Sequence, residues 1–167
     1  MRRIQIIVNN GAGTGSAVAV WKETKEYLQE NEISYNAYLT RYEKHAVKLA
    51  GQICGKIPEG PIYLLVVGGD GTINEVLNGI TDFDRVRLGV IPTGSGNDFA
   101  RNLGILRNTR EDLREITACI GQEQNGEKLQ RIDLGKVSWE GCEKPRIFGI
   151  SAGAGLDAIV CKKALHS

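Results

Sequence analysis

Two glycine-rich turns contain most of the residues in this sequence that could do chemistry. Residues 68–72 have the sequence GGDGT, and residues 92–98 have the sequence PTGSGND. Each turn follows a short apolar run and opens into a segment that can be helical. Backbone N–H groups and helix N-termini therefore come to one edge of a sheet, where anionic phosphate binds well. We expect the two turns to form a site for a phosphorylated ligand.

Asp70 lies inside the first turn, where its negative charge does not favour a phosphate. It is therefore expected to bind a cation, act as a base or cap a turn. A single GGDG turn is as often a tight turn closed by an Asx hydrogen bond. The second glycine-rich turn shifts the interpretation toward a ligand site.

The second turn supplies the hydroxyls of Thr93 and Ser95, and Asn97 is placed to cap the next helix. Hydroxyls and helix-start amides together suit the oxygens of a triphosphate. The alternative is a simple strand-to-helix connection, in which Asp98 interacts favourably with the helix dipole.

Residues 9–15, with the sequence NNGAGTG, form a weaker candidate. They miss the third glycine of the dinucleotide fingerprint, and no Gly-Lys-Ser/Thr follows as in a Walker A loop. Taken alone, this segment favours a turn over a ligand site. No HRD or DFG motif is present, and no GxSxG motif has a credible base, so protein-kinase and hydrolase chemistry are not indicated.

The elements that position these turns alternate regularly. We predict strands over residues 4–9, 34–40, 62–67 and 87–91, and helices over 18–31, 43–54, 72–79, 97–103 and 109–120. Thr72 is expected to be an N-cap, with Glu75 at the capping-box position. This order predicts an α/β fold with a parallel, Rossmann-like sheet. All three glycine turns then fall at the carboxyl ends of strands, where ligands bind in such sheets.

The pattern changes after Gly121. Residues 121–128 are polar, and strands are expected over 129–137 and 146–152 with a loop over 138–145. Asp133 follows Ile132 in the first of these strands, and from the residues alone it is expected to face solvent. Two or three strands do not bury a core by themselves. We therefore predict an α/β domain over 1–128 and the start of a truncated β-sandwich over 129–167, in an N-terminal portion of a longer protein.

Composition sets broad limits. The 167 residues are 41% hydrophobic and 25% charged with a net charge of +1, which fits a globular domain and gives no general attraction to nucleic acid. The four cysteines form no CxxC pair, and neither histidine stands at zinc-ligand spacing from them. No secretory signal or run of about 18 apolar residues is present. We expect a cytoplasmic protein that at most contacts a membrane surface.

The two central motifs resemble the catalytic domain of diacylglycerol kinases. GGDGT is followed by Asn74 and Glu75, and residues 92–101 have the sequence PTGSGNDFAR. The segment from Phe148 to Ala158 is similar to a later motif of this family. These soluble bacterial lipid kinases are related to sphingosine and ceramide kinases, and more distantly to NAD kinases.

The resemblance implies ATP-dependent phosphorylation of a lipid hydroxyl, converting diacylglycerol to phosphatidic acid with Mg²⁺. It implies a metal or proton-handling role for Asp70, and a water-linked magnesium network around Asp70, Asp98 and Asp133. The nucleotide-binding positions that it implies, or that the turns themselves suggest, are Asn9, Asn10, Gly11, Ala12, Gly13, Thr40, Gly68, Gly69, Asp70, Gly71, Thr72, Glu75, Thr93, Gly94, Ser95 and Asn97.

The sequence departs from the family pattern at three positions. Ser95 stands near a family threonine, Asn10 replaces a proline, and Ile150 replaces a common asparagine. The family also continues well beyond this length and carries its proposed general base there, so the fragment alone is expected to bind nucleotide with little activity.

Several alternatives stay open at the level of the sequence. These are another lipid such as sphingosine or a polyprenol-like alcohol, an NAD kinase, and a non-catalytic nucleotide-binding module. A phosphofructokinase-like enzyme also has GGDG, but its other motifs are missing. The expected partners are ATP, a lipid substrate, a transient membrane contact and a possible homodimer, with no nucleic acid.

Overall fold

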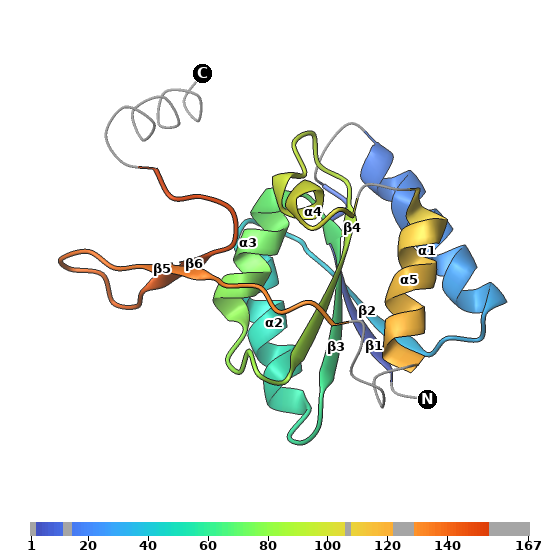
Figure 1. The fold of residues 1–167 in the computed structure, drawn as a ribbon, viewed down its shortest axis with the longest axis horizontal. Coiled ribbons are helices and arrows are strands. Elements are labelled where there is room, and N and C mark those ends of the chain that lie inside the picture. Colours follow the sequence, from blue (N-terminus) through green and yellow to red (C-terminus); the bar gives the residue numbers. More distant parts are fainter. Residues whose placement is uncertain (1–2, 12–14, 106–107, 122–128, 154–167) are drawn as a thin grey trace.

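A computed structural model describes residues 3–11, 15–105, 108–121 and 129–153. Its main part is a four-stranded parallel sheet in the order β2-β1-β3-β4 (Figure 1). The strands are β1 (Ile4–Val8), β2 (Tyr35–Leu39), β3 (Ile62–Gly68) and β4 (Val86–Pro92). This confirms the predicted α/β class and its parallel sheet. The four strands predicted for this sheet agree with the observed ones to within a residue at either end.

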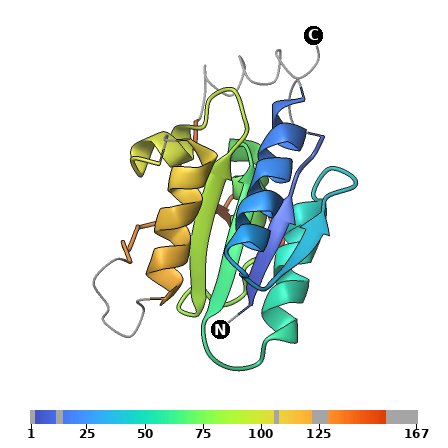
Figure 2. The same cartoon turned by 90° about the vertical axis from the view of Figure 1, so that its right-hand side faces the viewer.

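Helices cover both faces of the sheet. They are α1 (Ser16–Glu30), α2 (His45–Lys56), α3 (Asp70–Gly79), α4 (Asp98–Asn102) and α5 (Thr109–Gly121). Helices α1 and α5 lie on one face and α2 and α3 on the other (Figures 1 and 2). β3 is buried along its whole length because both of its faces are covered, which explains its continuous apolar sequence.

The side chains of the strands alternate between two cores. One core packs Ile7, Leu64 and Val66 against α2 and α3, and the other packs Ile6, Leu65 and Val67 against α1 and α5. The period of two along each strand sends neighbouring residues to opposite faces. The sheet is thus held rigidly from both sides, and the loops at its carboxyl edge start from fixed positions.

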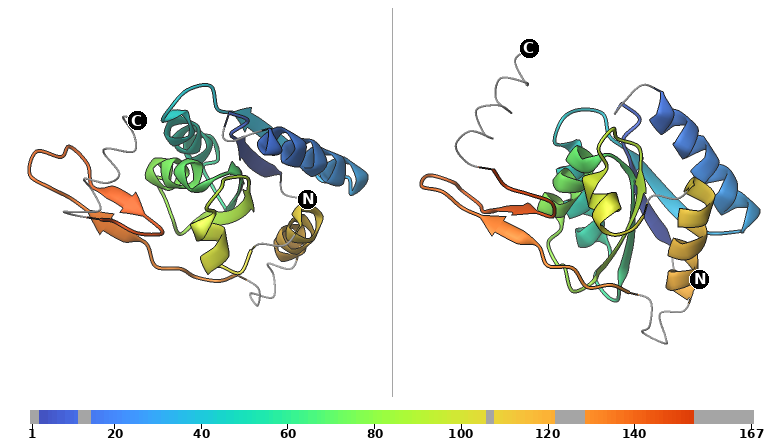
Figure 3. Two further views of the ribbon diagram at one scale, coloured as in Figure 1. Left: turned by 90° about the horizontal axis from the view of Figure 1, so that it is seen from above. Right: turned by 45° about the horizontal axis from the view of Figure 1, so that its top comes forward.

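After α5 the chain forms a small antiparallel hairpin of β5 (Gly135–Val137) and β6 (Arg146–Phe148). It packs outside α3, away from α1 and α5 (Figure 3). The strands predicted over 129–137 and 146–152 are therefore too long. The predicted boundary between residues 128 and 129, like the β-sandwich, stays a prediction.

None of the helices in the described part of the chain is both long and apolar enough to span a membrane.

Candidate functional site

The glycine-rich turns after β3 and β4 are in direct contact at the carboxyl edge of the sheet. A Cβ atom on Gly69 would lie 3.0 Å from the Cα of Gly94, and one on Gly94 would lie 2.9 Å from the Cα of Gly69. The backbone N–H of Thr93 donates to the carbonyl of Gly68 at 3.1 Å. The contact therefore requires glycine at both positions, and two loops that are separate in sequence form one surface.

The loop after β1 joins this surface through Asn9. Its Nδ2 donates to Oγ1 of Thr72 at 2.9 Å, and its Oδ1 accepts the N–H of Gly11 at 3.1 Å. Because Thr72 Oγ1 accepts this hydrogen bond, its own hydrogen is left to donate to a ligand. Three of the four loops at the carboxyl edge thus meet, as the alternating pattern predicts.

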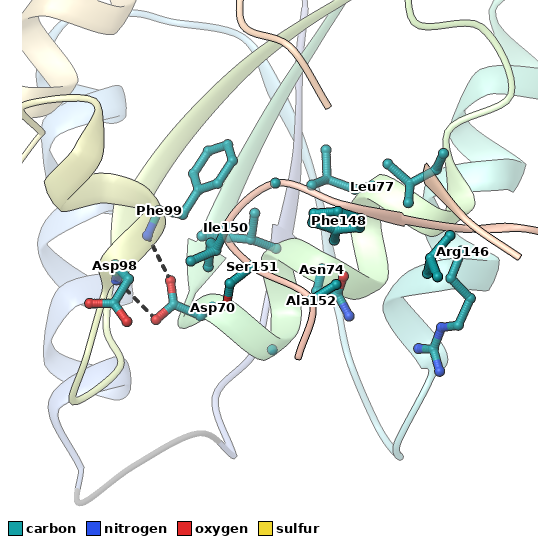
Figure 4. Close-up of a pocket in the computed structure, with 15 residues that line it drawn as sticks. Asp70, Asn74, Leu77, Asp98, Phe99, Arg146, Phe148, Ile150, Ser151 and Ala152 are labelled. Carbon is teal, nitrogen blue, oxygen red and sulfur yellow. Dashed lines mark hydrogen bonds between the residues drawn. The ribbon is translucent and has the colours of Figure 1, made fainter. Parts of the chain in front are cut away.

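Asp70 is the first residue of α3, and both of its carboxylate oxygens are used. Oδ2 accepts the N–H of Asp98 and Oδ1 accepts the N–H of Phe99, each at 3.0 Å (Figure 4). Asp70 therefore caps the N-terminus of α4 from a neighbouring helix. This is a cap on a neighbouring helix, not the local Asx turn considered from the sequence, and the cation and base roles of Asp70 stay predictions.

Asn97 closes the second turn. Its Oδ1 accepts the N–H of Gly94 at 2.8 Å, and its Nδ2 donates to the carbonyl of Gly94 at 2.6 Å. Asn97 occupies the N-cap position of α4 with a left-handed backbone and makes no side-chain cap hydrogen bond. The predicted cap at this helix is therefore supplied by Asp70, and the amide of Asn97 shapes the loop.

Two buried oxygens in these loops have no hydrogen-bond partner among the described residues. They are Oγ1 of Thr93, whose side chain is nearly fully buried, and Oδ1 of Asn10. Buried polar atoms are normally paired, so these two oxygens need a partner that the described residues do not supply, such as an ordered water or a ligand. A threonine hydroxyl can donate to a phosphate oxygen, and an amide oxygen can accept from a ligand hydroxyl or amine.

Three further predicted nucleotide positions, Thr40, Gly71 and Ser95, lie around this cluster. The N–H of Thr40 donates to the carbonyl of Val8 at 2.9 Å, which places the end of β2 beside the Asn9 loop. Gly71 and Ser95 are exposed at the same edge. Ala12 and Gly13 lie outside the described residues.

The structure places the carboxylate of Glu75 elsewhere. Its two oxygens accept the N–H groups of Lys44 at 3.0 Å and Ala46 at 3.2 Å, so Glu75 caps the N-terminus of α2. The predicted capping box is wrong because α3 begins at Asp70, after an N-cap at Gly69. This geometry does not support the predicted nucleotide contact of Glu75 either. Its partners are about 30 positions away in sequence, so the local pattern does not reveal them.

The predicted magnesium set is not assembled. Asp70 and Asp98 line one pocket, whereas Asp133 is exposed beside a groove formed by β4, α5 and residues 129–134. Among the described residues, no three His, Cys, Asp or Glu side chains come close enough to hold a metal ion. Asp98 instead approaches Arg101, with 3.5 Å between Oδ1 and Nη1. The described residues therefore do not gather three direct ligands for a magnesium ion, and the water-linked metal roles of Asp70, Asp98 and Asp133 stay predictions.

A pocket of about 400 Å³ adjoins the glycine turns on the side of the hairpin (Figure 4). One wall is formed by the first turns of α3 and the start of α4, including Asp70, Asn74 and Phe99. The opposite wall is formed by the end of β6 and the residues after it, including Phe148 and Ile150. The wall formed by the hairpin is not evident from the sequence, because the contact between the hairpin and α3 joins residues 69 positions apart.

The fold defines an α/β protein of the Rossmann-like type, with three loops that meet at the carboxyl edge of its parallel sheet. A family comparison goes further: the model of the diacylglycerol kinase catalytic domain matches residues 3–137. The chain belongs to this family.

The curated names of relatives are consistent with this family. YtlR of Bacillus subtilis is 31% identical over 163 residues, covering 96% of this chain and 50% of YtlR. The diacylglycerol kinase of the same organism is 37% identical over 143 residues, covering 83% of this chain and 43% of that enzyme. A solved structure of a diacylglycerol kinase from Bacillus anthracis has a TM-score of 0.57 and 28% identity, covering 70% of this chain and 39% of that one. The chain thus spans about half the length of the curated relatives it matches.

Proposed function

We propose that this chain is the nucleotide-binding portion of an ATP-dependent lipid kinase, which phosphorylates the hydroxyl of diacylglycerol to give phosphatidic acid. The main observation in support is the contact between the Gly69 and Gly94 turns, with the unpaired hydroxyl of Thr93 buried in the same loops. The family, and the names of relatives such as the Bacillus subtilis diacylglycerol kinase, support the same reaction class.

ATP would supply the phosphoryl group, and the chain would supply donors around it. The first-turn amides of α3 and the hydroxyls of Thr72 and Thr93 donate to phosphate oxygens and stabilise the charge that develops during transfer. Asp70 acts on this site indirectly, because it holds the start of α4 against the first turn through the amides of Asp98 and Phe99. No step is assigned to Mg²⁺, since the described residues do not gather ligands for it.

The pocket beside the turns suits the acceptor alcohol. Leu77, Phe99, Phe148 and Ile150 give it apolar walls, while Asn74 and Ser151 add polar groups. Apolar walls with a few polar groups are typical of sites that orient small molecules with one reactive end. The acceptor hydroxyl would enter here, next to Asp70 and the phosphate-binding turns. A lipid acceptor also implies transient contact with a membrane surface, and we propose that this takes place on the cytoplasmic side.

The test is transfer of the γ-phosphate of labelled ATP by the full-length protein that contains this chain. Diacylglycerol in mixed micelles, sphingosine and NAD are offered separately to wild type and to Thr93→Val. Labelled phosphatidic acid, reduced in the variant, is the expected result. Labelled NADP would assign NAD kinase activity instead. ATP binding without any labelled product would favour a non-catalytic nucleotide-binding module.

A further inference from the structure

Asn78, in the last turn of α3, forms hydrogen bonds to both backbone groups of one hairpin residue, Ile147. Its Nδ2 donates to the carbonyl of Ile147 at 2.8 Å, and its Oδ1 accepts the N–H of Ile147 at 2.9 Å. Ile147 is the central residue of β6. A single side-chain amide therefore provides the donor and the acceptor that a neighbouring strand would provide.

The orientation of this amide is fixed by a third hydrogen bond. Nδ2 also donates to the carbonyl of Asn74, one turn earlier in α3, at 2.8 Å. The nitrogen thus faces two carbonyl oxygens and the oxygen faces one N–H, which uses both hydrogens of the amide. Aspartate has the same size but would turn an oxygen toward both carbonyls, so this position specifically needs asparagine.

The contact with Asn78 fixes one edge of β6. Residues of an antiparallel strand direct their N–H and C=O groups alternately to one side and the other. Ile147 directs both groups to Asn78, and the other side of β6 pairs with β5, where Ile147 stands opposite Lys136. β6 therefore pairs with β5 along one edge and bonds to the side chain of Asn78 along the other. The side chain of Ile147 adds packing against the core that α2 and α3 share.

The acceptor-side wall of the pocket includes Ile147 itself and continues along the residues that follow it. Phe148, Ile150 and Ser151 line the pocket, and Gly149 approaches Phe99 so closely that a Cβ atom there would lie 2.7 Å from the ring. The opposite wall includes Asn74, on the same helix as Asn78. The spacing between the two walls is thus set where Asn78 meets Ile147.

We propose that Asn78 is a positioning residue that holds the acceptor-side wall of the pocket at its distance from the phosphate-binding turns. This inference rests on the proposed lipid kinase function. Asn78 itself does not line the pocket, so it acts through the wall and not through contact with a substrate. Its replacement therefore affects the acceptor alcohol and leaves nucleotide binding unchanged.

The experiment compares Asn78→Asp and Asn78→Ala with wild type in the full-length protein. Asn78→Asp is expected to raise the KM for diacylglycerol by about tenfold or more, because a carboxylate oxygen would then face the carbonyls of Asn74 and Ile147 in place of the Nδ2 donor. The KM for ATP is expected to stay within about twofold, since Asn78 shares no partner with the glycine turns. In Asn78→Ala, hydrogen exchange at the amide of Ile147 is expected to be about tenfold faster or more, because that amide loses its acceptor.

Asn31→Asp is the matched control. Asn31 makes the same type of bond, from Nδ2 to the carbonyl of Tyr27 four residues earlier at 2.8 Å, but it is exposed at the end of α1. This variant is expected to leave both KM values and the exchange of Ile147 unchanged.

Three results would overturn the inference. Unchanged exchange at Ile147 in Asn78→Ala would show that the contact does not hold β6. Faster exchange together with an unchanged KM for the acceptor, or with an equal loss of ATP affinity, would leave Asn78 with a structural role only. If wild type phosphorylates no lipid, the proposed function fails. The exchange and ATP-binding measurements then still decide whether Asn78 holds the wall independently of the nucleotide site.

Discussion

At the scale of single residues, Asp70 links the two glycine-rich turns. Its carboxylate accepts the backbone N–H groups of Asp98 and Phe99, so the first turn also fixes the start of α4 after the second turn. A carboxylate at a helix N-terminus satisfies orphan donors and interacts favourably with the helix dipole.

The cap predicts a graded effect of substitution at Asp70. Asp70→Ala removes both acceptors and is expected to lower the free energy of unfolding by about 1–2 kcal/mol. Asp70→Asn keeps one acceptor and is expected to cost less. Urea unfolding of both variants measures this order. Equal stability of Asp70→Ala and wild type would contradict the role as a cap.

Glu75 provides the second prediction at this scale. Because it caps α2, Glu75→Ala is expected to lower the free energy of unfolding by about 1 kcal/mol. Its affinity for ATP is expected to stay within about twofold of wild type, since the carboxylate is bonded to the start of α2 and not to the glycine turns. Unfolding and ATP titration of the same variant test both statements. Lost ATP affinity with unchanged stability would restore the nucleotide contact implied by the family resemblance.

At the scale of elements, the contact between the two turns sets the shape of the site. Gly94→Ala would bring a Cβ atom within 2.9 Å of Gly69 and 3.0 Å of Oδ1 of Asn97, so the turns must separate. Affinity for ATP is expected to fall about tenfold or more, as overpacking of this kind typically costs about 1–3 kcal/mol.

Gly55→Ala, in α2, is the matched control for Gly94→Ala. A Cβ atom at Gly55 would meet no described atom within 4 Å. This substitution is expected to raise stability by about 0.5–1 kcal/mol, because alanine favours helix, and to leave ATP affinity unchanged. Equal ATP affinity of the Gly94→Ala and Gly55→Ala variants would show that the turns need not touch.

The helix pair α1 and α5 is joined by an ion pair with a predicted pH dependence. Arg110 binds both carboxylate oxygens of Glu30, at 2.8 and 3.0 Å, and this hydrogen bonding lowers the pKa of Glu30. A carboxyl pKa that is lower in the folded state than in the unfolded chain stabilises the fold at pH values above the unfolded pKa. This stabilisation is lost as the pH falls through the pKa of the folded state.

The urea concentration at the midpoint of unfolding is therefore measured for wild type and Glu30→Gln. The difference between the two midpoints is expected to narrow on acidification below the usual glutamate pKa of about 4.3. It should also narrow in high salt, because the pair is exposed. A gap that does not change with pH would contradict the prediction.

The sequence predicts the elements of the sheet well because their pattern is local. Continuous apolar runs such as β3 show burial on both faces, and the glycine turns mark where those strands end. The predicted hairpin strands are longer than the observed ones, because the alternation of polar and apolar residues does not indicate how far a partner strand extends. The caps supplied by Asp70 and Glu75, and the contact made by Asn78, join residues 28 to 69 positions apart, which no local pattern encodes.

At the scale of the whole molecule, the described chain is a rigid α/β layer with a hairpin attached at one side. Helix α3 connects them: its first residues belong to the first glycine-rich turn, and Asn78 near its end bonds to β6. The candidate acceptor pocket lies between these two ends of α3 and the hairpin. Because the relatives are about twice as long, the complete acceptor site is expected to include residues beyond this chain.

The most direct test of the central claim is the affinity of the full-length protein for ATP, measured by isothermal titration with wild type, Thr93→Val and Thr117→Val. Thr93 supplies the buried unpaired hydroxyl in the glycine turns, whereas Thr117 lies on α5, where its hydroxyl bonds to the carbonyl of Leu113. The account predicts that wild type binds ATP, that Thr93→Val binds about tenfold more weakly, and that Thr117→Val matches wild type. Absence of ATP binding by wild type, or equal affinity of wild type and Thr93→Val, would contradict it.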